Sequence, residues 1–265
     1  MSKQMLDKAL ADKRKAGEKI FVPYIMAGDG GLNKLEERLN FLQESGAAAV
    51  ELGVPFSDPV ADGPTIQEAG QRSIANGTTL SGIFETLQTF REKRTLPIVF
   101  MTYLNPIYAY GIEKFAKSCE EAGVSGVIIP DLPMEEEDLL ANLLKQHAVA
   151  FIRLAALTSP KERLRDIAAR TEGFLYAVSV KGTTGARSAH EKEVHSYLQE
   201  LKEFTSLPVL AGFGVSNAEQ ARKLGSACDG VIVGSKIVDL LHHGKTEAIK
   251  ELIQGASGKK NISVN

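Results

Sequence analysis

One local pattern recurs along the whole chain: an amphipathic segment ends at a glycine, and a Val/Ile-rich run follows within a few residues. Clear examples are residues 42–53, 119–130 and 221–234. A glycine just past a helix supplies the left-handed conformation that ends it. A continuous apolar run is typical of a strand in a parallel sheet that is covered on both faces. The pattern therefore predicts repeated helix–strand units around a parallel sheet.

Eight apolar runs are strand candidates. They are residues 20–26, 48–53, 97–102, 126–130, 150–155, 174–178, 208–212 and 230–234. Eight alternating units without an interrupting linker favour a closed (β/α)8 TIM barrel over an open sheet. Because a chain of 265 residues has the usual length of one such barrel, we expect a single domain over residues 1–265.

Two parts of the chain predict helices beyond the eight units. Residues 65–94 are too many for one helix, and Asn76-Gly77-Thr78 divides them, so we expect an additional helix there. Residues 1–16 predict an N-terminal helix, which we expect to cover the bottom of the barrel.

Composition and charge exclude several classes of protein. Hydrophobic residues make up 43% and charged residues 24%, as in a globular protein with a large core. The net charge is −2 with both signs interspersed, which predicts neither nucleic-acid nor membrane binding. No apolar run has transmembrane length, and residues 1–19 are too charged for a signal peptide, so we expect a cytoplasmic protein. Cys119 and Cys228 lack metal-ligand spacing and are expected to be reduced packing residues.

Two carboxylates stand at the end of a strand, where a TIM barrel has its active site. Glu51 lies in the second strand, in a register that points it inward, and Asp62 follows in a proline-rich loop. An inward acid among apolar neighbours has a raised pKa and suits proton transfer. From these residues alone two alternatives stay open: Glu51 as a structural hydrogen-bond acceptor, and Asp62 as the cap of the helix that begins near Pro64.

Glycines after the last three strands form a second signal. They occur in residues 182–185, in residues 212–216 and at Gly234-Ser235. Such glycines leave backbone N–H groups unobstructed, and the helix after Gly234-Ser235 adds its positive dipole end. The pattern predicts a phosphate site, and the absence of a GxxxxGK[ST] run argues against nucleoside triphosphates.

The remaining polar residues near strand ends predict no further chemistry. Asp131, between Pro130 and Pro133, is expected to fix a loop. Lys181 lies in a loop, which disfavours a buried Schiff-base lysine. The five histidines stand at helix positions, so we expect neither a Ser-His-Asp triad nor a His-ligated metal.

The segments that carry these acids and glycines resemble the tryptophan synthase alpha subunit family, over about residues 17–241. Residues 51–64 (ELGVPFSDPVADGP) are the most specific part. Supporting segments are residues 130–133, Thr184-Gly185 and residues 212–216. The resemblance implies a lyase of tryptophan biosynthesis. It would cleave indole-3-glycerol phosphate to indole and glyceraldehyde 3-phosphate by a retro-aldol reaction, without a metal or organic cofactor.

The resemblance also implies roles for individual residues. Glu51 would serve as acid and base at C3 of the indole and at the C3′ hydroxyl, with Tyr176 beside its carboxylate. Asp62 would accept the indole N–H and stabilise the developing cation, and Thr184 would bond Asp62 to close the site. The implied indole walls are Phe21, Ile66, Ile128 and Phe213. The implied phosphate ligands are Gly185, Gly214, Gly234 and Ser235.

A partner is implied as well: a beta subunit that carries pyridoxal phosphate and receives the indole, in a heterotetramer of two alpha and two beta chains. Asp58, Asn105 and Pro133 match the positions that face it. The chain departs from the family at residues 28–31 (GDGG), where we expect a looser loop, and at Leu104, where a smaller residue is common.

Three other functions stay open. Another phosphate-binding barrel enzyme, such as a pentulose-phosphate epimerase or a phosphoribosyl isomerase, would use paired aspartates or metal-binding histidines at strand ends, which this chain lacks. A non-catalytic subunit would only activate its partner. A free-standing lyase would release indole to solution.

Overall fold

The computed structural model describes residues 2–178, 187–212 and 214–258. Its sheet has nine strands, all paired in parallel, in the order β5-β4-β3-β2-β1-β9-β8-β7-β6. The strands are β1 (Ile20–Met26), β2 (Val50–Gly53), β3 (Ile98–Met101), β4 (Gly126–Ile128), β5 (Ala150–Phe151), β6 (Leu154–Ala156), β7 (Leu175–Val178), β8 (Val209–Gly212) and β9 (Gly230–Val233).

The two end strands of this order are halves of one predicted strand. Only Ile152 and Arg153 separate β5, which pairs with β4, from β6, which pairs with β7. The sheet therefore closes through this strand, and the predicted (β/α)8 barrel is confirmed. The expectation of one continuous strand over residues 150–155 was wrong. At the break, Thr171 Oγ1 accepts the N–H of Arg153 at 3.0 Å, and a Glu172 carboxylate oxygen accepts the N–H of Phe151 at 3.1 Å.

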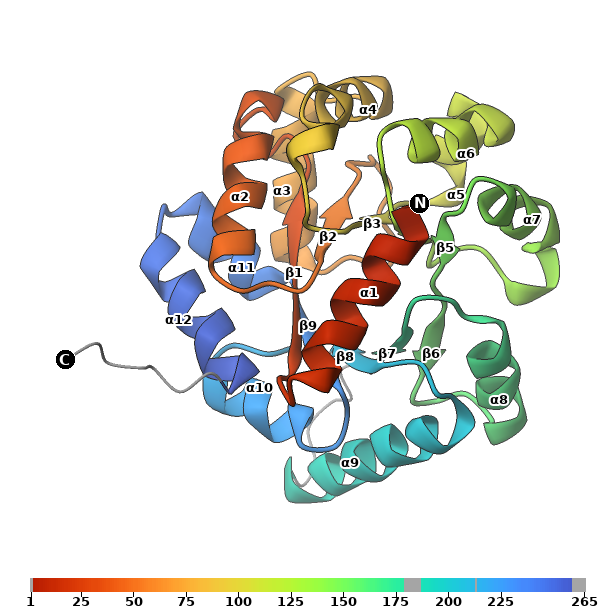
Figure 1. The fold of residues 1–265 in the computed structure, drawn as a ribbon, viewed down its shortest axis with the longest axis vertical. Helices are drawn as coiled ribbons and strands as arrows, with labels where there is room; N and C mark the ends of the chain where they lie inside the picture. The colour runs from red at the N-terminus through yellow and green to blue at the C-terminus, as the bar shows by residue number, and fades with distance from the viewer. Residues whose placement is uncertain (1, 179–186, 213, 259–265) are drawn as a thin grey trace.

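Helices surround the strands, as Figure 1 shows. The α-helices of the described residues are α1 (Ser2–Lys15), α2 (Leu35–Glu44), α3 (Pro64–Ala75), α4 (Leu80–Thr89), α5 (Leu104–Tyr110), α6 (Ile112–Glu121), α7 (Asp138–Gln146), α8 (Lys161–Arg170), α9 (Arg187–Phe204), α10 (Ala218–Gly225), α11 (Ser235–His242) and α12 (Thr246–Ser257). Short 3-10 helices are η1 (Leu32–Lys34), η2 (Arg91–Lys93) and η3 (Met134–Glu136). The additional helix predicted within residues 65–94 is confirmed as α4.

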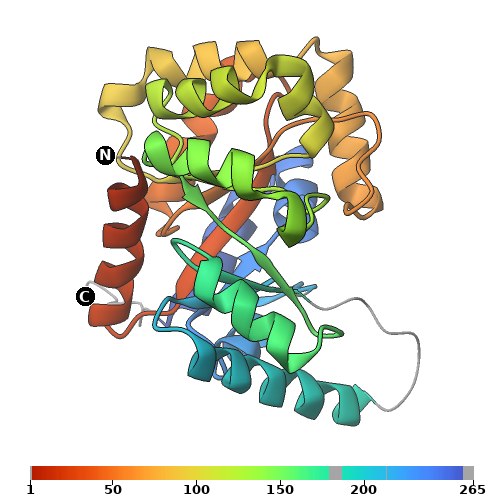
Figure 2. The same ribbon diagram turned by 90° about the vertical axis from the view of Figure 1, so that its right-hand side faces the viewer.

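The N-terminal helix α1 closes one end of the barrel. Leu6 and Leu10 are buried in the interior cluster, together with Ile20 at the start of β1 and Phe174. The turned view places α1 at one edge of the molecule and α3 toward the opposite side (Figure 2). The expectation that this helix covers the bottom of the barrel is therefore confirmed, and the opposite end stays open.

Strand β1 shows how the period of two sorts its side chains. Ile20 and Val22 belong to the interior cluster, whereas Phe21 and Ile25 belong to the cluster between the sheet and the outer helices. Tyr24 continues the inward series and lies in a small cluster near the open end. This register decides which β1 side chain reaches the site.

The loop after β1 is tied to α3. The Asp29 carboxylate accepts two hydrogen bonds from Arg72, both at 2.8 Å, and the Gly28 carbonyl accepts one from Asn76 at 3.0 Å. These contacts argue against the looser loop that we expected from its glycines.

None of the helices over the described residues combines the length and the apolarity needed to cross a membrane.

Candidate active site

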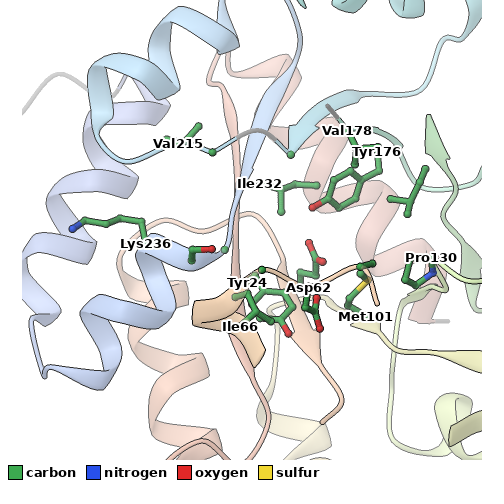
Figure 3. A pocket seen from close by; sticks show the side chains of 18 of the residues that line it. Tyr24, Asp62, Ile66, Met101, Pro130, Tyr176, Val178, Val215, Ile232 and Lys236 are labelled. Atoms are coloured by element: carbon green, nitrogen blue, oxygen red, sulfur yellow. The ribbon is translucent and has the colours of Figure 1, made fainter. Parts of the chain in front are cut away.

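A cavity of about 830 Å³ opens at the C-terminal ends of the strands (Figure 3). Strands and loops from around the whole barrel contribute to its wall. The lining residues are Tyr24, Glu51, Val60, Ala61, Asp62, Gly63, Ile66, Met101, Pro130, Leu154, Tyr176, Val178, Gly212, Gly214, Val215, Ser216, Ile232, Gly234, Ser235, Lys236 and Asp239. The two predicted acids and the predicted glycines of β8 and β9 thus share one cavity.

Glu51 projects from β2 into this cavity and is only 3% exposed. Burial, together with the negative charge of Asp62, raises the pKa of Glu51 to about 8, and a hydrogen bond from the Tyr176 hydroxyl opposes part of this rise. Its Oε2 atom is buried and has no hydrogen-bond partner among the described residues. An acceptor that served only the fold would be saturated, so the structural alternative does not fit this unpaired oxygen.

Asp62 lies in the loop that enters α3 and is half-buried. Burial raises the pKa of Asp62 to about 6, and a hydrogen bond from the Tyr103 hydroxyl opposes part of the rise. The N-cap of α3 is Gly63, with no side-chain cap, and Asp62 contributes only its backbone carbonyl, to Gln67 at 2.9 Å. The helix-cap alternative is therefore not observed.

Two glycines let tyrosines approach the acids. A Cβ atom on Gly53 would lie 1.9 Å from the Tyr24 hydroxyl oxygen, and one on Gly212 would lie 2.1 Å from the Tyr176 ring. Neither position has room for a side chain. Figure 3 shows the Tyr176 ring, Tyr24 and the Asp62 side chain directed into the same space.

Most of the described site predictions fall on this cavity. Ile66, Gly214, Gly234 and Ser235 line it, as does Tyr176. Ile128 does not: it is fully buried in the interior cluster, against which Met101 and Tyr176 pack. Thr184, Gly185 and Phe213 lie outside the described residues.

Phe21 was assigned wrongly to the indole wall. It is 1% exposed and belongs to the cluster between the sheet and the outer helices, away from the cavity. The physical reason is the alternation of side chains along β1, which turns Phe21 outward and Tyr24 inward. Stepping by two residues from the inward Val22 would have identified Tyr24.

Sequence reasoning also missed Met101, Leu154 and Lys236 in the cavity wall. Met101 is the last residue of β3, and the alternation of side chains along that strand would have identified it. Leu154 is the first residue of β6, and its position could not be predicted because the sequence does not show the break before it. Lys236 follows Ser235 in α11 and stands across the cavity from Met101 and Pro130 (Figure 3).

Asp131 fixes a neighbouring loop, as expected. Its carboxylate accepts the backbone N–H of Leu104, at 3.0 and 3.2 Å, where α5 begins. The three residues predicted to face a partner, Asp58, Asn105 and Pro133, are all exposed. They follow β2, β3 and β4, which are neighbours in the sheet, so they belong to one side of the open end.

Comparison with known proteins gives a consistent result. The family model described as tryptophan synthase alpha chain matches residues 10–263. The tryptophan synthase alpha chain of Oceanobacillus iheyensis is 57% identical over 262 residues, which cover 99% of this chain and 100% of that protein. The alpha chain of a Bacillus cereus strain is 53% identical over 92% of this chain and 95% of that protein.

Solved structures agree. The crystal structure of tryptophan synthase subunit alpha from Legionella pneumophila superposes with a TM-score of 0.86 at 32% identity, covering 95% of this chain and 96% of that one. A Mycobacterium tuberculosis tryptophan synthase structure gives a TM-score of 0.86 at 31% identity, covering 96% and 98%.

Proposed function

The chain belongs to the tryptophan synthase alpha chain family, and from this premise we propose which of its residues perform the family's reaction. That reaction is the cleavage of indole-3-glycerol phosphate to indole and glyceraldehyde 3-phosphate, a carbon–carbon lyase step of tryptophan biosynthesis. The observation that carries the proposal is the pair of acids, Glu51 and Asp62, in one cavity at the open end of the barrel.

Glu51 is the acid and then the base. With a pKa of about 8 it is protonated at neutral pH, so it can give a proton to C3 of the indole. The resulting carboxylate takes the proton of the C3′ hydroxyl. The C3–C3′ bond then breaks, its electron pair returns to the ring, and the hydroxyl-bearing carbon becomes the aldehyde. The unpaired Oε2 supports this role, and Tyr176 holds the carboxyl group in place.

Asp62 stabilises the charge that this proton transfer creates. Protonation at C3 leaves a positive charge on the ring nitrogen, and an ionised carboxylate beside the N–H stabilises the transition state more than the substrate. The lower pKa of Asp62, about 6, keeps it ionised at neutral pH. Two acids whose environments push their pKa values apart are suited to different tasks.

The rest of the cavity suits the two ends of the substrate. Backbone N–H groups of Gly214, Gly234 and Ser235 would bind the phosphate, with the N-terminus of α11 behind them. Ile66 would wall the indole, together with Tyr24 and Met101. Thr184, Gly185 and Phe213 keep the roles that the family resemblance implies. Because Glu51 performs both proton transfers and Asp62 stabilises the charge that develops, we propose that the reaction needs neither a metal nor an organic cofactor.

The partner that we propose is a tryptophan synthase beta chain, which receives the indole. The two would form a complex of two alpha and two beta chains. Support comes from the exposure of Asp58, Asn105 and Pro133 on one side of the open end. The exposed Val60 and Tyr108 add apolar surface to the same loop and helix. As an enzyme of amino-acid biosynthesis, the complex would work in the cytoplasm.

The direct test is to incubate the purified chain with indole-3-glycerol phosphate, alone and with a tryptophan synthase beta chain, and to follow indole and tryptophan. We expect cleavage that increases when the beta chain is present. No product in either case would contradict it, and full activity alone with no response to the beta chain would favour a free-standing lyase.

A further inference from the structure

We propose that Tyr103 is a positioning residue for the reaction: its hydroxyl holds the Asp62 carboxylate in place, and the Asp131 carboxylate holds Tyr103. The inference rests on the function proposed for Asp62. Tyr103 itself is 2% exposed and is not part of the cavity wall, so it would act only through Asp62.

The Tyr103 hydroxyl makes two contacts with the loop between β2 and α3. It donates a hydrogen bond to the Asp62 carboxylate and accepts the backbone N–H of Ala61 at 3.1 Å. Its ring also packs against Phe56 of the same loop, with the ring centroids 5.5 Å apart. Tyr103, two residues after β3, therefore contacts this loop near its start, at Phe56, and near its end, at Ala61 and Asp62.

Asp131 fixes the other side of Tyr103. Tyr103 is the N-cap residue of α5, and the Asp131 carboxylate accepts the N–H of the next residue, Leu104. A carboxylate at a helix N-terminus satisfies a free backbone donor and interacts favourably with the helix dipole. The loops after β4, β3 and β2, which are adjacent strands, are therefore joined in series, from Asp131 through Tyr103 to Asp62.

The chemical consequence follows from the groups around Asp62. Glu51 from β2, Tyr24 from β1 and Tyr176 from β7 face it across the cavity, and burial opposes its ionised form. The hydrogen bond from Tyr103 favours the ionised form, which is the form that the reaction needs. Without that donor the pKa of Asp62 should rise further, and its carboxylate should lose its fixed orientation.

The test is Tyr103→Phe, which keeps the ring contact with Phe56 and removes only the hydroxyl. The acidic limb of the kcat/KM profile should move upward by about one pH unit, as expected for the loss of one hydrogen bond to a charged group. The titration of the Asp62 carboxyl in the free protein, followed by 13C NMR, should move in the same direction. Tyr110→Phe is the matched control: Tyr110 is the last residue of α5, and its hydroxyl contacts Ser118 of α6 instead of the loop that carries Asp62.

Two variants of Asp131 test the same inference, and they can replace Tyr103→Phe if that variant folds poorly. Asp131→Asn keeps an oxygen acceptor for the N–H of Leu104 and should behave nearly as the wild type. Asp131→Ala removes the acceptor and should shift both titrations upward, by less than Tyr103→Phe does. In the Tyr103→Phe background, Asp131→Ala should add nothing.

Unchanged titrations in Tyr103→Phe, or equal shifts in Tyr110→Phe, would overturn the inference. The Asp62→Asn variant tests the function proposed for Asp62 separately from the inference about Tyr103. A fully active Asp62→Asn enzyme would contradict the role of Asp62 in catalysis, while the NMR titration would still decide whether Tyr103 acts on this carboxylate.

Discussion

Glu51 and Asp62 show how position alone can give two carboxylates different chemistry. Glu51 belongs to a strand and is almost fully buried, whereas Asp62 lies in a loop and is half-buried. Their pKa values are accordingly raised to about 8 and about 6. Between these two values, Glu51 is protonated while Asp62 is ionised, which is the combination that the proposed mechanism requires.

The pH dependence of kcat/KM should therefore be bell-shaped. Activity should fall below about pH 6, because Asp62 becomes protonated and loses its charge, and should fall above about pH 8, because Glu51 loses the proton that it must donate. Steady-state rates of indole release across this range check both limbs. A rate that keeps rising through pH 9 would contradict the role of Glu51 as an acid.

The sequence predicted this acid pair because the strand register and the proline-rich segment are local features. Phe21 was assigned wrongly because side chains alternate along β1, and Phe21 belongs to the outward set while Val22 and Tyr24 belong to the inward set. The contact between Tyr103 and Asp62 could not be predicted, since it joins side chains from two different strand ends, and only folding brings these together.

At the scale of elements, the break between β5 and β6 is the main departure from the expected barrel. Arg153 lies at the break and makes two 2.8 Å hydrogen bonds to the Glu137 carboxylate. The two side chains are 10% and 3% exposed. The sequence did not reveal the break because its acceptors, Thr171 and Glu172, come from the segment before β7.

Arg153→Met should lower the free energy of unfolding by about 3–5 kcal/mol, because it leaves Glu137 buried without its main partner. Arg170, 3.2 Å from the same carboxylate, is half-exposed and compensates only in part. Urea denaturation measures the change. Arg163→Met, which breaks the exposed pair with Glu135, is the control and should cost less than about 1 kcal/mol. Equal losses in the two variants would contradict the importance that we assign to the buried pair.

At the scale of the whole molecule, the two ends of the barrel have different tasks. The interior cluster joins residues that are far apart in the sequence, from Leu6 of α1 to Ile232 of β9, and α1 closes it at one end. For that reason we propose that residues 1–265 form one domain. The repeated helix–strand pattern predicted this architecture because each unit carries its own apolar period and terminal glycine.

The open end is where we place the beta-chain interface. Asn105→Arg should raise the Kd for a tryptophan synthase beta chain by about tenfold or more, because it adds a long charged side chain to the contact surface. Titration calorimetry measures this affinity. Ile74→Arg, at the end of α3 far from the cavity, alters another exposed position and should leave the Kd unchanged. Equal affinities in all three proteins would place the interface elsewhere.

The most direct test of the two-acid mechanism compares Glu51→Gln, Asp62→Asn and the exposed control Glu113→Gln in indole release, and in the binding of glycerol 3-phosphate, a stable analogue of the product. We predict that Glu51→Gln lowers kcat by about a thousandfold or more and Asp62→Asn by about a hundredfold, while all three variants bind the analogue as the wild type does. Near-normal indole release by Glu51→Gln, or loss of analogue binding in parallel with activity, would contradict the mechanism.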